Sequence, residues 1–526
     1  MKVDVLSREQ QTELKRILNL KDIKQIERMG KLFTTEFNNY FYDTGTGKVI
    51  LIDDEIYNIM YVLFNNKISA DKSENIFKSD SISGTLSEFL TVVLSEHLLN
   101  SPSMDKLYTY NHYENLENSI NHDLHQIILE LTGRCNLRCG YCIYNDDYQF
   151  NRSFNQNDMS IEIAKASVDY AEKHSDKDIA VTFYGGEPLL KFDLLKSTIN
   201  YALERLTNKN LSFSLTTNLT LVTKEIADFF ASVPNLSIVC SLDGPEYVQN
   251  SYRKYINSTG TFNDAIIGLE LLSNAFSRSS TNTLSINAVL APPYKYDKIN
   301  DINSFFKDLK FLPHNTNINI GYAADNSVKE KGHILALRNN PKYTHNSDNK
   351  LNPLWIWQKK QAEIHQQIRD GKNSIYASAI EEALVHIHKR YISDEIIDKF
   401  PFNGCCVPGA RRLYVDANGN LSTCERIGTS PSIGNIICGI NFENIRKFYI
   451  DDYSAGSIKY CANCWAIRLC STCYVDNYCE TGFCAEEKNS KCEGMRNSLV
   501  SQLSLFHSLQ ESSPEKLRFL EDMVVV

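Results

Sequence analysis

Residues 132 to 142 read Thr-Gly-Arg-Cys-Asn-Leu-Arg-Cys-Gly-Tyr-Cys and carry three thiols, Cys135, Cys139 and Cys142. Three thiolates in one short loop can bind three irons of a [4Fe-4S] cube and leave the fourth iron open to a substrate or cofactor. A structural zinc site is the alternative, but zinc sites prefer paired C-x2-C units with a further ligand at a regular distance. The spacing therefore favours an iron-sulfur cluster with one open iron.

The bulk composition sets the class of protein. The chain has 526 residues, 42% hydrophobic and 23% charged, with a net charge of -9. This length predicts roughly two to four domains, and the composition is that of a globular protein. The acidic charge argues against a nucleic acid or an anionic membrane as partner. Because neither a long apolar segment nor a secretion signal is apparent, we expect a cytoplasmic protein with no membrane partner.

The cysteines are unevenly distributed. Of the fifteen, three lie near residue 140 and ten lie between Cys405 and Cys492, which leaves Cys240 and Cys438 in apolar runs. Disulfides are rare in the cytoplasm, so such clustering indicates metal binding. We expect Cys240 and Cys438 to be buried, inert thiols.

The middle of the chain alternates between strand-like and helical patterns from residue 124 to residue 323. This alternation predicts an α/β fold with a parallel sheet, and six βα units suggest a partial barrel. The strand-like runs are 125–131, 179–184, 211–216, 236–242, 284–290 and 318–322. The helical patterns are 161–173, 192–206, 224–233, 262–276 and 299–309.

Unusual residues follow the first four of these runs. They are the Cys135 loop, Gly185-Gly186-Glu187-Pro188, Thr217-Asn218 and Asp243-Gly244-Pro245. In βα barrels, the loops after the strands share one rim and carry the catalytic residues. An ordinary turn is the alternative for the Gly-Gly-Glu-Pro run, but its glycines would also let the backbone approach a ligand.

The Cys135 motif, Tyr141 within it and the Gly-Gly-Glu-Pro turn together resemble the radical S-adenosylmethionine (SAM) enzymes. The resemblance implies that SAM chelates the open iron and that electron transfer yields a 5'-deoxyadenosyl radical, which abstracts a hydrogen atom. It places the methionine amino group at the Gly-Gly-Glu-Pro turn, on Glu187 or the neighbouring carbonyls, and the carboxylate at Ser241 and Arg253. It assigns ribose and adenine to Asn218, Asn287 and Val289, with Tyr141 near the adenine. Each assignment has an alternative. Arg253 could be a solvated loop residue, Asn218, Asn287 and Val289 could be plain strand-end residues, and Tyr141 could be a core tyrosine. The implied SAM contacts are Tyr141, Gly185, Gly186, Glu187, Pro188, Asn218, Ser241, Arg253, Asn287 and Val289.

Residues 401–494 resemble the SPASM extension of this family, which holds two auxiliary [4Fe-4S] clusters and would bring the total to three. By analogy, one cluster would take Cys406, Cys424 and Cys473, with a fourth ligand that the analogy does not identify. The other would take Cys461, Cys464, Cys470 and Cys492. The surplus thiols Cys405, Cys479 and Cys484 either complete a site or stay free. The last interval of the cysteine run is two residues instead of the family's three, and a zinc ribbon is the alternative for the run.

Glu425 directly follows Cys424, the last residue of the run Gly419 to Cys424, which resembles the Gly-x4-Cys hairpin of the SPASM extension. Sulfatase-maturing relatives are expected to carry an acidic base at this place, so we expect Glu425 to accept a proton from substrate. A salt bridge to Arg426 or Arg411 is the alternative.

The first 110 residues predict a small sheet with helices. Alternating segments at 29–42 and 48–52 flank a glycine-containing turn, with one helix near 10–20 and another behind Asp53, a plausible N-cap. This winged-helix-like layout is similar to domains that bind the leader of a precursor peptide as an added strand. A purely structural cap is the alternative.

The remaining segments carry no motif. Residues 324–400, with a helical pattern over 355–391, would bridge barrel and SPASM domain, and residues 495–526 would begin with a packed helix. The whole resembles a radical SAM SPASM peptide maturase of the sactipeptide or ranthipeptide type. The resemblance implies thioether cross-links in a ribosomally made peptide, with flavodoxin or ferredoxin as electron donor. The alternatives are carbon-carbon cross-links, formylglycine formation as in anaerobic sulfatase maturases, and a non-catalytic scaffold or electron carrier.

Overall fold

The computed structural model describes residues 6–18, 23–65, 84–144, 152–292, 296–313, 316–323, 375, 377–521 and 523. Most of the expected helical pattern at 355–391 and of the bridging region lies outside the described residues. Within the described part, helix α16 spans Ala377–His388.

A ten-stranded sheet forms the centre of the molecule, in the order β13-β12-β11-β10-β4-β5-β6-β7-β8-β9. Strands β4 to β9 are parallel neighbours in chain order, which confirms the predicted mixed α/β fold with a mostly parallel sheet. Each lies within about two residues of a predicted apolar run. Their bounds are Gln126–Thr132, Asp178–Gly185, Asn210–Thr217, Leu236–Ser241, Thr283–Leu290 and Asn317–Tyr322.

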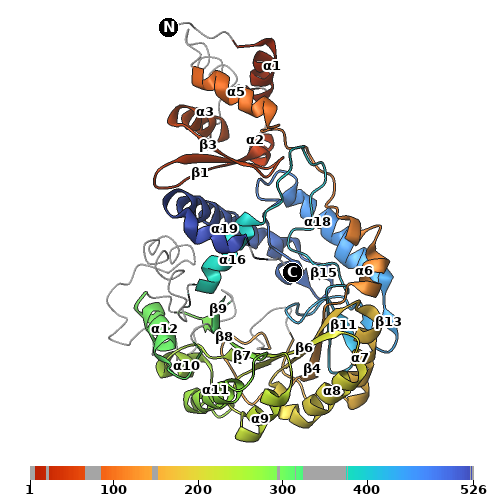
Figure 1. Cartoon of the computed structure of the whole chain (residues 1–526). Helices are drawn as coiled ribbons and strands as arrows, with labels where there is room; N and C mark the ends of the chain where they lie inside the picture. Colours follow the sequence, from red (N-terminus) through yellow and green to blue (C-terminus); the bar gives the residue numbers. More distant parts are fainter. Residues whose placement is uncertain are drawn as a thin grey trace.

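Helices connect these strands and lie along the outer side of the sheet (Figure 1). Polar caps fix two of the helix starts, because Ser160 Oγ accepts from Ile163 N and Thr223 Oγ1 accepts from Ile226 N. The connecting helices are α7 Ile161–His174, α8 Phe192–Arg205, α9 Lys224–Ser232, α10 Glu246–Tyr252, α11 Phe262–Phe276 and α12 Tyr296–Asp308. The sequence pattern gave no hint of the short α10.

The sheet continues into the C-terminal third of the chain. Strand β10, Arg412–Val415, pairs in parallel with β4, so that Leu413 lies beside Ile127. Strands β11 Asn420–Ser422, β12 Gly434–Asn435 and β13 Gly439–Ile440 follow as antiparallel neighbours. The sequence did not predict this seventh parallel strand, whose four residues are too few to show a period. It fixes the hairpin before Cys424 to the strand that carries the Cys135 loop.

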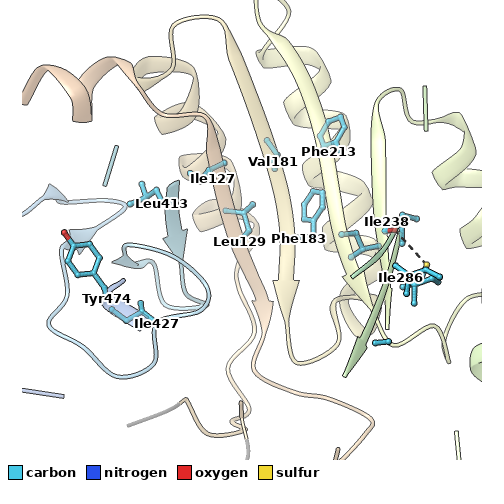
Figure 2. Close-up of a cluster of buried hydrophobic side chains, with 14 of the residues drawn as sticks. Ile127, Leu129, Val181, Phe183, Phe213, Ile238, Ile286, Leu413, Ile427 and Tyr474 are labelled. Carbon is cyan, nitrogen blue, oxygen red and sulfur yellow. Dashed lines mark hydrogen bonds between the residues drawn. The ribbon is translucent and has the colours of Figure 1, made fainter. Parts of the chain in front are cut away.

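One hydrophobic core joins the two regions. Figure 2 shows Ile127, Leu129, Val181, Phe183, Phe213, Ile238 and Ile286 from the parallel strands in the same cluster as Leu413, Ile427 and Tyr474. Leu129, Phe183 and Leu413 are each fully buried. Burial of this continuous apolar surface is what holds the C-terminal region against the sheet.

The N-terminal module, residues 6–100, has its own three-stranded antiparallel sheet, β1 Gly30–Thr34, β2 Asn39–Asp43 and β3 Val49–Ile52. The expectation of one alternating segment at 29–42 was wrong. A turn splits it, because Thr35 Oγ1 accepts from Asn38 N and Thr35 N donates to Asn38 O. The predicted cap is confirmed, since Asp53 Oδ1 accepts from Ile56 N at 2.8 Å. The helices are α1 Arg8–Leu18, α2 Ile23–Met29, α3 Asp54–Asn65 and α5 Gly84–Ser95.

The two faces of this small sheet have different neighbours. Leu32, Phe41 and Ile50 pack among the helices of the module, whereas Phe33 and Tyr40 belong to the main core. Tyr40 stacks on Phe33 and donates a hydrogen bond to Glu511 of helix α19. The module is therefore docked on the body of the protein through one face of its sheet.

The C-terminal region is helical around short hairpins. Helix α19 runs from Ala485 to Ser512, so it begins ten residues before the expected start at 495 and contains Cys492. Other elements of this region are α17 Phe442–Asn444, α18 Asp452–Cys461, β14 Tyr478–Cys479 and β15 Gly482–Phe483, whereas α6 Leu116–His122 precedes β4 in the chain. None of the described helices is long and apolar enough to span a lipid bilayer.

Candidate active site

The three thiols of the first motif lie in the loop after β4, surrounded by hydrogen-bond donors. Leu137 N is 3.4 Å from Cys135 Sγ, Tyr144 N is 3.5 Å from Cys142 Sγ, and Asn218 Nδ2 is 3.9 Å from Cys135 Sγ. Burial raises the pKa of the Cys135 thiol to about 12 and raises that of Cys139 further. Thiols with so high a pKa keep their protons near neutral pH, and metal binding would release them, with the nearby donors stabilising the charge on sulfur.

Neighbouring loops hold this loop on two sides. On one side, Arg138 N donates to Lys254 O at 2.8 Å and Gly140 N donates to Tyr252 O at 3.0 Å. On the other side, Glu187 N donates to Arg134 O at 2.9 Å. The loop is thereby fixed before any metal binds, which reduces the conformational entropy lost on binding.

The two glycines of the Gly-Gly-Glu-Pro turn let the backbone approach the thiol loop. A Cβ on Gly186 would lie 2.0 Å from Arg134 O, and one on Gly185 would lie 2.4 Å from Thr132 O. Gly185 also has φ +138°, which side chains disfavour. The glycines are thus required by packing against the thiol loop.

The Glu187 carboxylate is fully engaged with the chain. It accepts from Leu189 N at 3.1 Å, from Thr217 Oγ1 at 2.8 Å and from Asn218 N at 2.8 Å. Burial raises its pKa to about 7, although these hydrogen bonds oppose the shift. The carboxylate therefore ties the turn to the end of β6. This engagement favours the backbone carbonyls of the turn over the carboxylate as acceptors for the SAM amino group.

A buried ion pair lies beside the thiol loop. Arg253 Nε is 3.1 Å from Asp243 Oδ1, and the two side chains are 8% and 1% exposed. The Tyr141 hydroxyl donates to the other oxygen of Asp243. Burial alone would lower the pKa of Arg253, but Asp243 raises it above its ordinary value. Arg253 is therefore not a solvated loop residue. Asp243 was not among the predicted site residues, although its place in Ser-Leu-Asp-Gly-Pro could have indicated it.

The residues expected near ribose and adenine surround a small apolar patch. Ser241 at the end of β7 pairs in register with Asn287 of β8. Val289 N donates to Asp243 Oδ1 at 3.0 Å, and Val289 packs with Tyr141 and Tyr252 in one cluster. The structure thus brings Tyr141, Ser241, Asn287 and Val289 to one rim of the sheet.

Lys298 of α12 was missed by the sequence reading. It is 3% exposed, and its Nζ donates to Ala291 O at 2.7 Å beside the same apolar patch. Burial lowers its pKa to about 8, and Asp243 opposes that shift. A lysine on a helix carries no indication of burial until the fold is known.

A second buried polar group links the thiol loop to the C-terminal hairpin. Tyr144 OH donates to Glu130 Oε1 at 2.8 Å, and the Arg152 guanidinium lies 3.8 Å from the centre of the Tyr414 ring. Arg152 Nη2 also donates to Ile427 O at 2.9 Å. Arg152 and Glu130, which the sequence did not single out, bridge the two regions.

Glu425 lies at this junction. Its Oε1 is 3.9 Å from Nη1 of Arg412, an arginine that the sequence did not single out as its partner. Its Oε2 is buried and makes no hydrogen bond within the described residues. Burial raises the pKa of Tyr184, and Glu425 and Cys142 both add to that shift. Glu425 and the thiol loop therefore approach the same tyrosine at the end of β5.

One group of auxiliary thiols shares a small cavity of about 20 Å³. Its walls include Cys461, Cys464, Cys470 and Cys492, the set that the family resemblance assigned to one cluster. Lys488, only 1% exposed, lines the cavity and donates to Asn403 Oδ1 at 3.2 Å. Its charge lowers the pKa of Cys461 and Cys492 against the effect of burial. A buried cation is what four neighbouring thiolates require.

The other group contains Cys424, Cys473 and the adjacent pair Cys405 and Cys406. Burial raises the pKa of Cys473 to about 11, and the nearby Cys424 contributes to that shift. Burial also raises the pKa of the Cys405 thiol, and the nearby Cys473 and Cys406 both add to that shift. The structure thus brings these four thiols into one neighbourhood.

The surplus thiols have separate places. Cys479 lies on β14, and Cys484 precedes α19. Cys240 is buried as expected, but the expectation for Cys438 was wrong, because its thiol is exposed at the β12–β13 turn. The apolar run around Cys438 lies in the turn between β12 and β13, two strands of only two residues each. In the part of the chain that the structure describes, no three acidic, histidine or cysteine side chains are spaced for a single metal ion.

Comparison with known proteins identifies the class. Residues 129–305 match the radical SAM superfamily, so the chain carries a radical SAM domain, whose members use SAM and a [4Fe-4S] cluster. The matched segment begins within β4 and includes the Cys135 loop. The residues around that loop fit such a cluster, since backbone and amide donors lie near the thiols of Cys135 and Cys142.

Individual relatives narrow the class. The chain is 26% identical over 360 residues to a cysteine-type anaerobic sulfatase-maturating enzyme of Clostridium novyi. This match covers 65% of this chain and 85% of that protein. It is 23% identical over 263 residues to the radical SAM cyclopropyl synthase TigE of Paramaledivibacter caminithermalis, covering 47% and 52% of the two chains. Several curated relatives are matched over only about half of their length. The protein is thus a relative of peptide- and protein-modifying radical SAM enzymes.

A solved structure shares the fold. The structure of anSMEcpe with bound AdoMet superposes with a TM-score of 0.52 at 17% sequence identity. The match covers 76% of this chain and 96% of that one.

Proposed function

We propose that this protein is a radical SAM enzyme that forms thioether links between cysteine sulfur and carbon atoms in a ribosomally made precursor peptide. The observation that carries the proposal is the junction at β4 and β10. There β10 pairs with β4, and Glu425 and Cys142 both approach Tyr184, so one rim of the sheet carries the Cys135 loop, the Cys424 thiol and a carboxylate.

The cofactor set comprises SAM and three [4Fe-4S] clusters. Cys135, Cys139 and Cys142 hold the SAM-binding cluster, which with SAM supplies a carbon-centred radical able to abstract a hydrogen atom. Cys461, Cys464, Cys470 and Cys492 hold one auxiliary cluster. Cys424, Cys473 and Cys405 or Cys406 hold the other. A flavodoxin or ferredoxin of the cytoplasm supplies the electrons.

The chain binds SAM through groups already fixed in place. The carbonyls of the Gly-Gly-Glu-Pro turn accept from the amino group, and Arg253 with Ser241 holds the carboxylate. Asp243 orients both Arg253 and Tyr141. The apolar patch around Val289 and Tyr252 excludes water from the adenine.

Glu425 accepts the proton of the substrate cysteine. The 5'-deoxyadenosyl radical takes the hydrogen atom from carbon, and the remaining electron would pass to an auxiliary cluster, so that each link loses two hydrogens. Its buried Oε2 has no hydrogen-bond partner among the described residues, which leaves this oxygen free to take a proton. We expect Glu425→Gln to lower peptide turnover by at least about a hundredfold, the lower end of what a general base contributes. Release of 5'-deoxyadenosine from SAM should continue, because no SAM contact is lost. Full turnover in this variant, measured by mass spectrometry of the peptide, would end the assignment.

The N-terminal module binds the leader of the precursor. Its three-stranded sheet has open edges on which an extended peptide gains main-chain hydrogen bonds. The presence of such a module favours the proposed function over that of a sulfatase maturase.

Formylglycine formation in a sulfatase is the second candidate. The 85% coverage of the Clostridium novyi sulfatase-maturating enzyme and the acidic residue after Cys424 favour it. Co-expression separates the candidates. With a neighbouring cysteine-rich peptide, mass spectrometry should show loss of two hydrogens per link and no free thiol. Unchanged peptide together with a formylglycine in a co-expressed sulfatase would overturn the thioether proposal.

A further inference from the structure

A large groove lies between strand β1 of the N-terminal module and helix α19. Its volume is about 1010 Å³, and its walls come from β1, α3, the end of α18 and one face of α19. In Figure 1, β1 lies directly above α19. The volume is at the upper end of ordinary ligand pockets, which suits a chain of several residues better than a small molecule.

Strand β1 is an edge of its sheet, and its unpaired backbone faces this groove. Thr44 N donates to Met29 O, and Thr35 N donates to Asn38 O, each at 3.0 Å. Positions bonded to the partner strand alternate along an antiparallel ladder, so the odd-numbered residues of β1 face β2. The even-numbered ones present N–H and C=O groups away from it. They are Gly30, Leu32 and Thr34, and all three line the groove.

The remaining walls supply side-chain pockets and charge. Tyr57, Tyr61 and Phe64 of α3 provide aromatic surface. Three cations, Lys31, Lys459 and Arg496, outnumber the two anions, Glu27 and Glu36, in a chain whose net charge is -9. This combination favours an extended peptide that carries apolar side chains and carboxylates.

The groove also touches an auxiliary thiol group. Tyr460, Cys464 and Arg496 line both the groove and the small cavity that contains Cys461, Cys470 and Cys492. A peptide in the groove therefore runs from the N-terminal module toward the part of the molecule that carries the clusters of the proposed function.

We propose that this groove binds an extended segment of the precursor peptide as a fourth strand on β1, and that the opposite edge, β3, does not. The inference rests on the proposed function and names its peptide-binding surface. The four walls enclose the added strand between the sheet edge and α19, and the cations of α18 and α19 pair with peptide carboxylates.

Proline at matched edge positions tests the added strand. Thr34→Pro removes an N–H that faces the groove from an exposed residue at the end of β1. Leu51→Pro is the control: Asp43 N donates to Lys48 O, so position 51 of β3 also points its N–H outward, and Leu51 is 62% exposed. Proline is tolerated at such edge positions, and thermal unfolding checks that both variants fold.

The probe is a library of 16-residue peptides displayed on phage and selected on the full, cluster-loaded protein. Enriched peptides are synthesised with a fluorophore, and their dissociation constants are measured by anisotropy. We expect Thr34→Pro to raise the dissociation constant about tenfold, as loss of a buried main-chain hydrogen bond does. Leu51→Pro should change it less than twofold. Ser504→Trp, which fills the groove from α19, should also weaken binding.

Four outcomes would overturn the inference: no enriched peptide, equal binding by all variants, weakening by Leu51→Pro instead of Thr34→Pro, or an effect of Thr34→Pro only on reduction by flavodoxin. The last would assign the groove to the redox partner. Release of 5'-deoxyadenosine from SAM by the unaltered protein is measured separately. Its absence would refute the proposed function without bearing on the peptide site.

Discussion

The shape of the thiol loop depends on a few close contacts made by individual residues. Gly186 has no room for a side chain beside Arg134, and Asp243 joins Arg253, Tyr141 and the backbone of Val289. Each contact is buried, so a lost partner leaves a polar group without water to replace it. Substitutions at such positions should act on SAM and cluster binding before they act on the overall fold.

Gly186→Ala should displace the thiol loop, because the new Cβ would meet Arg134 O at 2.0 Å. We expect the variant to lose most of its SAM-binding cluster, measured as iron content and absorbance near 400 nm after reconstitution. Gly494→Ala is the control, since no atom lies within 4 Å of its Cβ in helix α19. That change should stabilise the protein by up to about 1 kcal/mol. Normal cluster content in Gly186→Ala would contradict the packing role of the glycine.

Glu187 should make the stability of the cluster-free protein depend on pH. Its folded pKa of about 7 lies above the unfolded value of 4.5, so the folded protein binds the extra proton. Its contribution is therefore fully present below pH 4.5 and is lost as pH rises through 7, by up to about 3 kcal/mol. The difference in unfolding free energy between the unaltered protein and Glu187→Gln, from urea titrations, should shrink over this range. A constant difference would contradict the raised pKa.

At the scale of elements, the apolar runs predicted the six parallel strands because each buried strand is a continuous hydrophobic segment with a turn after it. The thiol loops were found for a similar reason, since cysteine spacing is a local property. Strand β10 was missed, because its four residues become a strand only by pairing with β4. Lys298 and Lys488 were missed because burial of a charged residue depends on distant segments, whereas Asp243 was placed on the rim but given no role.

Leu413→Ala tests the role of β10 in joining the two regions. The side chain is fully buried beside Ile127, so its loss should cost about 2–5 kcal/mol of unfolding free energy. Ile437→Ala is the control, because that side chain is 70% exposed, and it should change stability by less than about 0.5 kcal/mol. Urea denaturation measures both. Equal stability of the two variants would show that β10 does not hold the hairpin on the sheet.

At the scale of the whole molecule, three thiol groups and a peptide groove lie on one continuous body. The sheet carries the first thiol group, β10 brings the second to it, and α19 carries Cys492 of the third as well as a wall of the groove. The N-terminal module packs on α19 through Phe33 and Tyr40. Under the proposed function, a peptide held in the groove would be tethered to the same chain as the Cys135 loop, which would raise its effective concentration there.

Release of 5'-deoxyadenosine from SAM by the anaerobically purified, dithionite-reduced protein tests the central claim most directly. The unaltered protein and the exposed-thiol control Cys438→Ser should both release it. Replacement of Cys135, Cys139 and Cys142 by alanine should abolish release. No release by the unaltered protein, or undiminished release by the triple variant, would contradict a cluster-bound SAM in this loop.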